Sequence, residues 1–252
     1  MSRLKSFFRL PHWLARHGWA PITAALLFVA GVWLFYGIAD EVREGDTQRF
    51  DERVVRALRR PDNLSQPIGP KWLVEVGRDV TALGGMAVLT LVTMGVCGYL
   101  AVARRWRTMV FVILATTGGL LLSLWLKGLF DRERPSVVPH LDEVFTSSFP
   151  SGHAMLSSIV YLTHGTLLMR VVKPWRLRLY ILSIALLLPL LIGLSRVYLG
   201  VHYPTDVLAG WTAGLAWGLG CWSVTQFLQH RGNLEPEPPD TDEGDDADSN
   251  DE

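Results

Sequence analysis

The sequence predicts an all-α membrane protein with six transmembrane helices. Of its 252 residues, 49% are apolar and only 19% are charged. The apolar residues are concentrated in six runs, each close to the roughly 20 helical residues that cross a ~30 Å hydrocarbon core. A soluble domain would spread them over shorter amphipathic elements. We therefore expect one integral membrane domain over residues 19–230.

The six apolar runs define the expected spans. Glycine and proline occur inside several of them, as at Pro189, where neighbouring helices can cover the freed backbone groups. The first run follows a basic stretch, but it has 21 residues and no small-x-small cleavage site after it, so we interpret it as a retained span rather than a signal peptide. The expected spans cover residues 19–39, 81–103, 108–127, 154–172, 179–199 and 206–228.

Three segments outside the spans have compositions of their own. Residues 1–18 are basic and amphipathic, and we expect them in the cytoplasm. Residues 40–80 mix charged side chains with apolar positions at helical spacing. This pattern predicts short amphipathic helices along the membrane surface, with a solvated loop as the alternative. Residues 231–252 contain ten acidic residues against one arginine, which predicts a disordered tail.

Charge and cysteine content narrow the classes further. The 24 basic and 24 acidic residues balance formally, but ten of the acids lie in the tail, so the rest of the chain is basic. Cys97 and Cys221 lie inside apolar runs. There they act as small hydrophobic residues rather than as a disulfide pair or a metal site.

The loops suggest an orientation in the membrane. With six spans, the loops on each side of the membrane carry twelve Lys and Arg residues in total, so these numbers alone do not determine the orientation. Dense basic runs at 104–107 and 170–178 lie in short connections, where the positive-inside rule applies most directly. We therefore place both termini in the cytoplasm. The connections between spans 1 and 2, 3 and 4, and 5 and 6 then lie on the outer side of the plasma (inner) membrane.

Side chains that can bind an anion or transfer a proton lie in and beside two of these connections, between spans 3 and 4 and between spans 5 and 6. Ionised side chains near hydrocarbon usually face a cavity or a partner, although any one alone could be a snorkelling anchor. Three cations without comparable acids predict an anion site, most simply for a phosphoryl group. The backbone N–H groups of Ser151 and Gly152 are expected at a helix N-terminus, which binds phosphate, although an ordinary helix start remains the alternative. The loops and their flanks carry Lys127, Arg134, His153, Arg196, His202 and Asp206.

The spacing of His202 and Asp206 predicts a nucleophile and its orienting partner. A helix that begins near Tyr203 lets the Asp206 carboxylate bond one imidazole nitrogen and leaves the other free to attack phosphorus. His153, from the facing loop, can then protonate the departing oxygen. His164 lies three turns further along the fourth span, and we interpret it as a hydrogen-bonded interior residue. Phosphoryl transfer needs positioning and charge neutralisation, so we expect neither a metal nor a cofactor.

Three segments carry a resemblance to a known family: KGLFDRERP (127–135), PSGH (150–153) and SRVYLGVHYPTD (195–206). They resemble the K-x6-RP, PSGH and SR-x5-H-x3-D signature of the type-2 phosphatidic acid phosphatase superfamily, which includes vanadium haloperoxidases and glucose-6-phosphatase. All eleven specified positions are present. The resemblance implies that His202 becomes phosphohistidine, that Asp206 orients it and that His153 is the general acid. It also implies a set of phosphate-holding residues, namely Lys127, Arg134, Ser151, Gly152, Ser195 and Arg196.

The resemblance and the spans together favour an integral-membrane phosphatase that hydrolyses a lipid phosphomonoester or diphosphate, of the undecaprenyl diphosphate, phosphatidylglycerol phosphate or phosphatidate type. A phosphotransferase acting between lipids would use the same residues and stays open, whereas six spans disfavour soluble halide chemistry. A proton-coupled transporter would place its ionisable groups near mid-membrane, and a lipid-binding scaffold would not need both histidines. The expected partners are the bilayer and a lipid phosphate, without nucleic acid; the oligomeric state stays open.

Overall fold

The computed structural model describes residues 20–142 and 146–230, and it is mostly helical, as predicted. Residues 1–18 and 231–252, expected as an amphipathic N-terminus and a disordered tail, lie outside the described residues. The elements are α2 (Ala20–Glu44), α3 (Gln48–Ala57), β1 (Arg59–Arg60), β2 (Asn63–Pro67), α4 (Lys71–Ala82), α5 (Met86–Val102), α6 (Trp106–Phe130), α7 (Gly152–Val171), α8 (Trp175–Tyr198) and α9 (Pro204–His230).

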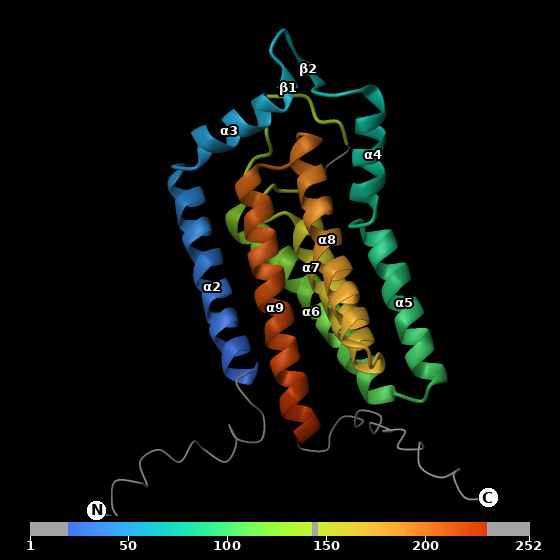
Figure 1. The fold of residues 1–252 in the computed structure, drawn as a ribbon. Helices are drawn as coiled ribbons and strands as arrows, with labels where there is room; N and C mark the ends of the chain where they lie inside the picture. The colour runs from blue at the N-terminus through green and yellow to red at the C-terminus, as the bar shows by residue number, and fades with distance from the viewer. Residues whose placement is uncertain (1–19, 143–145, 231–252) are drawn as a thin grey trace, which may run out of the picture.

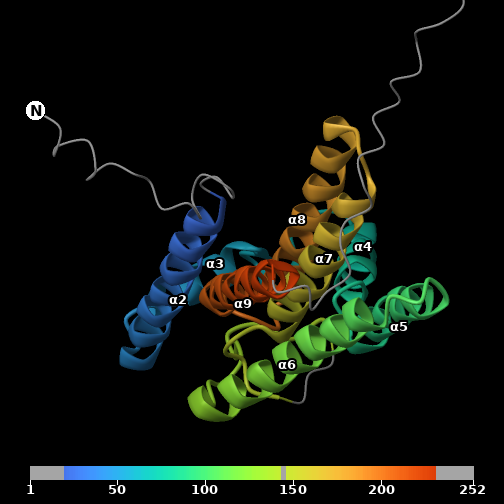
Figure 2. The same ribbon diagram turned by 90° about the horizontal axis from the view of Figure 1, so that it is seen from below.

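The long helices lie side by side in a bundle with α9 near its centre (Figures 1 and 2). Helix α9 packs against α2 on one side and α7 on the other, and α7 also packs against α8. Helix α3 and the β1–β2 hairpin lie across one end of this bundle (Figure 1). The ends of α6 and α8 and the starts of α7 and α9 point toward that same end.

Four helices, α2, α6, α8 and α9, are long and apolar enough to cross a membrane by length and composition. Helices α4 and α5 meet the same test only together, as a pair bent by 44°. The expected span 81–103 is therefore divided, because α4 ends at Ala82 and α5 begins at Met86. The described residues thus give four candidate spans, or five with the bent pair, where the sequence predicted six.

Helix α7 occupies the expected fourth span but does not meet this test. Its sequence includes serine, threonine and histidine, and most of its first three turns are buried. Contacts with α8 and α9 take the place of lipid there. Within α7 itself, the buried hydroxyl of Ser158 donates to the carbonyl of Ala154 at 2.8 Å. Polar side chains are tolerated in a helix that faces other helices rather than hydrocarbon.

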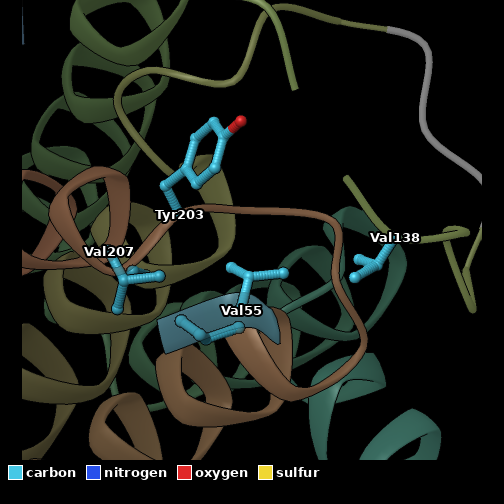
Figure 3. Close-up of a cluster of buried hydrophobic side chains, with 6 residues drawn as sticks. Val55, Val138, Tyr203 and Val207 are labelled. Carbon is cyan, nitrogen blue, oxygen red and sulfur yellow. The ribbon is translucent and has the colours of Figure 1, made fainter. Parts of the chain in front are cut away.

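Residues 40–80 contain two short helices, α3 and α4, and a hairpin that the sequence did not predict. Strands β1 and β2 are antiparallel, and Arg59 pairs with Pro67 and Arg60 with Asn63. An apolar cluster joins α3 to the rest of this end: Val55 lies near Tyr203 and Val207 of the α9 region and Val138 of the loop after α6 (Figure 3). The loop region is thereby built into the bundle.

Glycines set the separation of α7 and α9. A Cβ atom at Gly210 would lie 2.7 Å from the carbonyl oxygen of Ser151, and one at Gly214 would lie 2.7 Å from that of Met155. Both distances are too short for a carbon–oxygen contact, so a side chain at either position would push the helices apart. The crossing therefore fixes how the first turn of α7 faces the first turn of α9.

The substitution Gly214→Ala is expected to destabilise the fold by about 1–3 kcal/mol, because the new methyl group meets backbone that cannot rotate away. The measurement is thermal unfolding of the full chain in detergent. Gly218→Ala, one turn further along α9, is the matched control, since a Cβ there meets nothing within 4 Å and alanine is the better helix former. Equal melting temperatures for the two variants would contradict the packing argument.

Candidate active site

The residues predicted to carry chemistry lie at the end of the bundle that α3 covers (Figure 1). Lys127 belongs to the last turn of α6 and Arg196 to the last turn of α8. His153 lies in the first turn of α7 and Asp206 in the first turn of α9. Arg134 and His202 lie in the two connections between these helices. The structure thus brings both predicted loops to one place.

The imidazole of His202 is almost completely buried, at 1% exposure. Its Nδ1 lies 3.5 Å from Oδ2 of Asp206 and 3.4 Å from the hydroxyl of Ser148. Its Nε2 lies 3.2 Å from Nη1 of Arg134. The arginine can only donate, which makes Nε2 the acceptor and assigns the proton to Nδ1. The lone pair of His202 therefore points toward the cations.

Asp206 is fully buried, and both its oxygens are engaged. Oδ1 accepts from Nη1 of Arg132 at 2.6 Å. Oδ2 accepts from the hydroxyl of Ser148 and from the backbone N–H of Tyr203 at 2.8 Å. The separation of Oδ2 from the imidazole, 3.5 Å, is longer than a normal hydrogen bond. Such contacts often tighten only when the substrate is bound.

Lys127 and Arg134 are held by carbonyl oxygens of the α6–α7 and α8–α9 connections. Lys127 Nζ donates to the carbonyl of Ser147 at 2.6 Å. Arg134 donates to the carbonyls of Thr146 at 2.7 Å and Val201 at 2.6 Å. These bonds use backbone acceptors, and within residues 20–142 and 146–230 neither positive charge has a carboxylate hydrogen-bonded to it. An anion can supply that missing charge.

Arg196 is differently placed. It is 2% exposed, and its Nη1 donates to Asp142 at 2.6 Å and to the hydroxyl of Thr81 at 3.3 Å. Its Nε is buried and has no hydrogen-bond partner within the described residues. An unsatisfied buried donor is costly, and a phosphate oxygen is one acceptor that would remove this cost.

The start of α7 differs in one respect from the sequence prediction. The backbone N–H of Ser151 was expected to bind phosphate, but it donates to the carbonyl of Asp206 at 2.9 Å. The close crossing with α9 produces this contact. The Ser151 hydroxyl is buried and lacks a partner in the described structure. At Gly152, a Cβ would lie 3.3 Å from Cε of Lys127, so a side chain there would press on the lysine.

The other predicted residues are less directly engaged. The hydroxyl of Ser195 donates to the carbonyl of Ile192, one turn earlier in α8, at 2.7 Å. His153 is partly exposed, and Arg196, Asp142, Lys127 and Arg134 are its electrostatic neighbours. His164 bonds the carbonyl of Val160 through Nδ1, as expected of an interior residue, while its Nε2 has no partner in the described part of the chain.

Electrostatics keep His202 neutral. Complete burial lowers the pKa of His202 well below its ordinary 6.5, and the positive charges of Arg134, Arg196 and Lys127 lower it further. Burial also lowers the pKa of Arg134, to about 10, with the charge of Arg196 adding to the effect. At neutral pH the arginine is therefore still charged while the imidazole is not. This is the state in which a histidine can act as a nucleophile.

Sequence reasoning missed several residues that complete this face. Arg132 bridges Asp206 to Asp51 of α3, and Ser148 supplies a hydroxyl to both Asp206 and His202. Arg132 stands inside the K-x6-RP segment and Ser148 two residues before PSGH, so both lay within reach of a closer reading of the signature. Among the described residues, no group of three or more His, Cys, Asp or Glu side chains could hold a metal ion.

Comparison with known proteins assigns the chain to a family. The sequence model of the PAP2 superfamily matches residues 107–229. Phosphatidylglycerophosphatase B of Bacillus subtilis is 32% identical over 188 residues, which make up 72% of this chain and 86% of that relative. The chain belongs to the PAP2 superfamily. This membership and the phosphatase relatives make it a phosphatase.

Two further similarities support the PAP2 assignment. A crystal structure of a transmembrane PAP2-type phosphatidylglycerolphosphate phosphatase from Bacillus subtilis superposes with a TM-score of 0.68 at 28% identity, covering 83% of this chain and 98% of that one. An undecaprenyl-diphosphatase from Sulfolobus acidocaldarius is 42% identical over 67 residues, 27% of this chain and 28% of that relative. With its apolar helices, the PAP2 chain is an integral membrane protein.

Replacing Arg134 by glutamine is expected to raise the pKa of His202, because one of the charges that oppose imidazole protonation is removed. In the unaltered protein His202 stays neutral as the pH falls through 6.5; in Arg134→Gln it takes up its proton at a higher pH. Nitrogen NMR of histidine-labelled protein follows this directly, with the His202 signal assigned by its loss in His202→Ala.

Lys71→Gln is the control for this titration, since Lys71 is exposed and is not among the charges that act on His202. Its His202 signal should titrate as in the unaltered protein. A His202 signal that titrates identically in Arg134→Gln would show that the arginine does not control the imidazole.

Proposed function

We propose that the chain is a lipid phosphate phosphatase that works through a phosphohistidine on His202. One observation carries the proposal: the buried imidazole turns Nδ1 toward Asp206 and its Nε2 lone pair toward the guanidinium of Arg134. A phosphate drawn to Arg134 would place its phosphorus in front of Nε2. Lys127 and Arg196 act on the same imidazole as neighbouring charges.

The reaction has two displacement steps. In the first, the Nε2 lone pair of His202 attacks phosphorus, a P–N bond forms, and the P–O bond to the lipid breaks. Burial and the charge of Arg196 lower the pKa of His153 to about 3. The negative charge of the bound phosphate opposes this effect, and the protonated His153 of that complex gives its proton to the departing oxygen. In the second, neutral His153 takes a proton from water as the water oxygen attacks phosphorus and the P–N bond breaks. Inorganic phosphate leaves, and both histidines return to their starting forms.

Charge on the phosphoryl oxygens is met by the protein itself. Lys127, Arg134 and Arg196 supply three cations, and arginine offers a planar fork that matches two oxygens. Ser151 contributes its buried hydroxyl, Gly152 allows the first turn of α7 to approach, and Ser195 completes the predicted set. Prearranged donors of this kind stabilise a phosphoryl transition state without a metal or cofactor.

The substrate belongs to the membrane lipids that carry a phosphomonoester or a diphosphate. Phosphatidylglycerophosphatase B and undecaprenyl-diphosphatase are relatives with one kind each in their names. In both kinds the apolar part stays in the bilayer while the phosphate reaches the site at the helix ends. We place this site at headgroup level on the extracytoplasmic side of the inner membrane, with six spans and both termini in the cytoplasm.

The proposal predicts an isolable covalent intermediate. Rapid acid-free quenching of the purified chain with ³²P-labelled phosphatidylglycerol phosphate or undecaprenyl diphosphate should yield a base-stable, acid-labile label. His202→Ala should show neither label nor phosphate release, and His153→Ala should release phosphate roughly 10²–10⁴-fold more slowly.

His164→Gln is the control, because it removes another imidazole of α7 three turns away and should keep normal turnover. A normal rate of phosphate release by His202→Ala would rule out the proposed nucleophile.

Phosphate release is also expected to continue in excess EDTA, because the three cations are side chains rather than bound ions. The measurement compares rates after dialysis against EDTA with rates after divalent ions are restored. A strict requirement for a divalent ion would contradict the assignment of charge neutralisation to Lys127, Arg134 and Arg196.

A further inference from the structure

Asp51 is a fully buried carboxylate outside the family signature and outside the residues that the PAP2 model matches. It lies in α3, in the segment that joins the first two helices expected to span the membrane. A buried charge is strongly unfavourable unless it is paired and hydrogen-bonded. The partners of the Asp51 carboxylate among the described residues are Arg132 and Thr205, which lie beside Asp206 in the candidate active site.

The contacts of Asp51 form a chain that ends at His202. Oδ2 of Asp51 lies 2.7 Å from Nη2 of Arg132, and Nη1 of the same guanidinium lies 2.6 Å from Oδ1 of Asp206. Arg132 therefore bridges two carboxylates, each of them 0% exposed. Thr205 adds two more donors to Asp51, its backbone N–H at 3.2 Å and its hydroxyl.

Neighbouring groups hold Arg132 in this bridging position. The ring of Tyr203 lies under its guanidinium, with Cζ 4.5 Å from the ring centroid. Gln48, three residues before Asp51, accepts from Nη2 of Arg132 at 3.3 Å and donates to the Tyr203 hydroxyl at 3.1 Å. One turn after Asp51, Val55 packs in the cluster with Tyr203 (Figure 3).

A second buried charge close by in sequence contacts the other end of the α8–α9 connection, in which His202 lies. Arg59, at 2% exposure, donates through Nη1 to the carbonyl of Tyr198 at 2.9 Å, where α8 ends. Asp51 accepts from Thr205, where α9 begins. A cation at a helix C-terminus and an anion at a helix N-terminus are both favourable. The segment 48–60 thus holds both helix ends between which His202 lies.

We propose that Asp51 is a positioning residue for catalysis: through Arg132 it fixes the Asp206 carboxylate, and through Asp206 it orients the imidazole of His202. While both carboxylates bond the guanidinium, Arg132 donates to Asp206 Oδ1 through Nη1 alone. Oδ2 of Asp206 then stays on the side that faces the His202 imidazole. Without Asp51, Arg132 is free to turn both branches onto Asp206 and draw Oδ2 away from Nδ1. This inference rests on the proposed function.

The test is a double-mutant cycle on the full chain in detergent, with kcat and KM for a lipid phosphate. Asp51→Asn should lower kcat roughly 10–100-fold, since small misplacements of reacting groups cost about that much, while KM stays within about twofold. Because Asp51 acts through Arg132, the Asp51→Asn/Arg132→Gln double variant should be no slower than Arg132→Gln alone. Losses that multiply, or an unchanged kcat in Asp51→Asn, would overturn the proposal.

Asp46→Asn is the matched control, because it removes an exposed carboxylate from the turn just before α3 and should leave kcat unchanged. An equal loss in Asp46→Asn would assign the effect to the segment rather than to the bridge. If Asp51→Asn does not fold, Arg132→Lys keeps the charge but cannot span both carboxylates, and a normal kcat there would overturn the proposal. Unaltered protein that releases no phosphate from any lipid mono- or diphosphate would instead refute the proposed function itself.

Discussion

Burial of the Asp206 carboxylate is the constraint that organises the catalytic end of the bundle. A carboxylate with 0% exposure is tolerated only when each oxygen is paired. Arg132 and Ser148 come from the loop after α6, and Tyr203 donates its backbone N–H from just before α9. Arg132 in turn bonds a second buried carboxylate, Asp51 of α3. One buried charge therefore ties together three segments that are distant in sequence.

The main chain of Asp206 has a second role, since its carbonyl accepts from the backbone N–H of Ser151. The same residue thus turns its carboxylate toward Nδ1 of His202 and sets the register of α7 with its backbone. The glycine at 210 allows this contact by keeping the two helices close. His153 follows Ser151 by two residues, in the first turn of α7, and the two histidines share Arg134, Arg196 and Lys127 as neighbouring cations.

The sequence predicted what is local and missed what is long-range. Helices α6 and α9 were expected at 108–127 and 206–228 and occur at Trp106–Phe130 and Pro204–His230, because apolar runs of this length have few alternatives. Asp51 was one of nine acids in residues 40–80, and nothing near it in sequence indicates a partner 81 residues away. The Ser151 N–H was assigned to phosphate for the same reason: a helix crossing is not written in either helix alone.

Three cations close together repel one another, and the loop before α7 limits that cost. Asp142 pairs with Arg196 through Nη1, while Lys127 and Arg134 are held by carbonyl oxygens, which carry only partial charge. The positive charge is thus reduced at Arg196 and kept near His202 Nε2, where the proposed reaction places phosphorus. A phosphate that enters competes with Asp142 for Arg196, whereas at Lys127 and Arg134 the described part of the chain brings no carboxylate into hydrogen-bond contact.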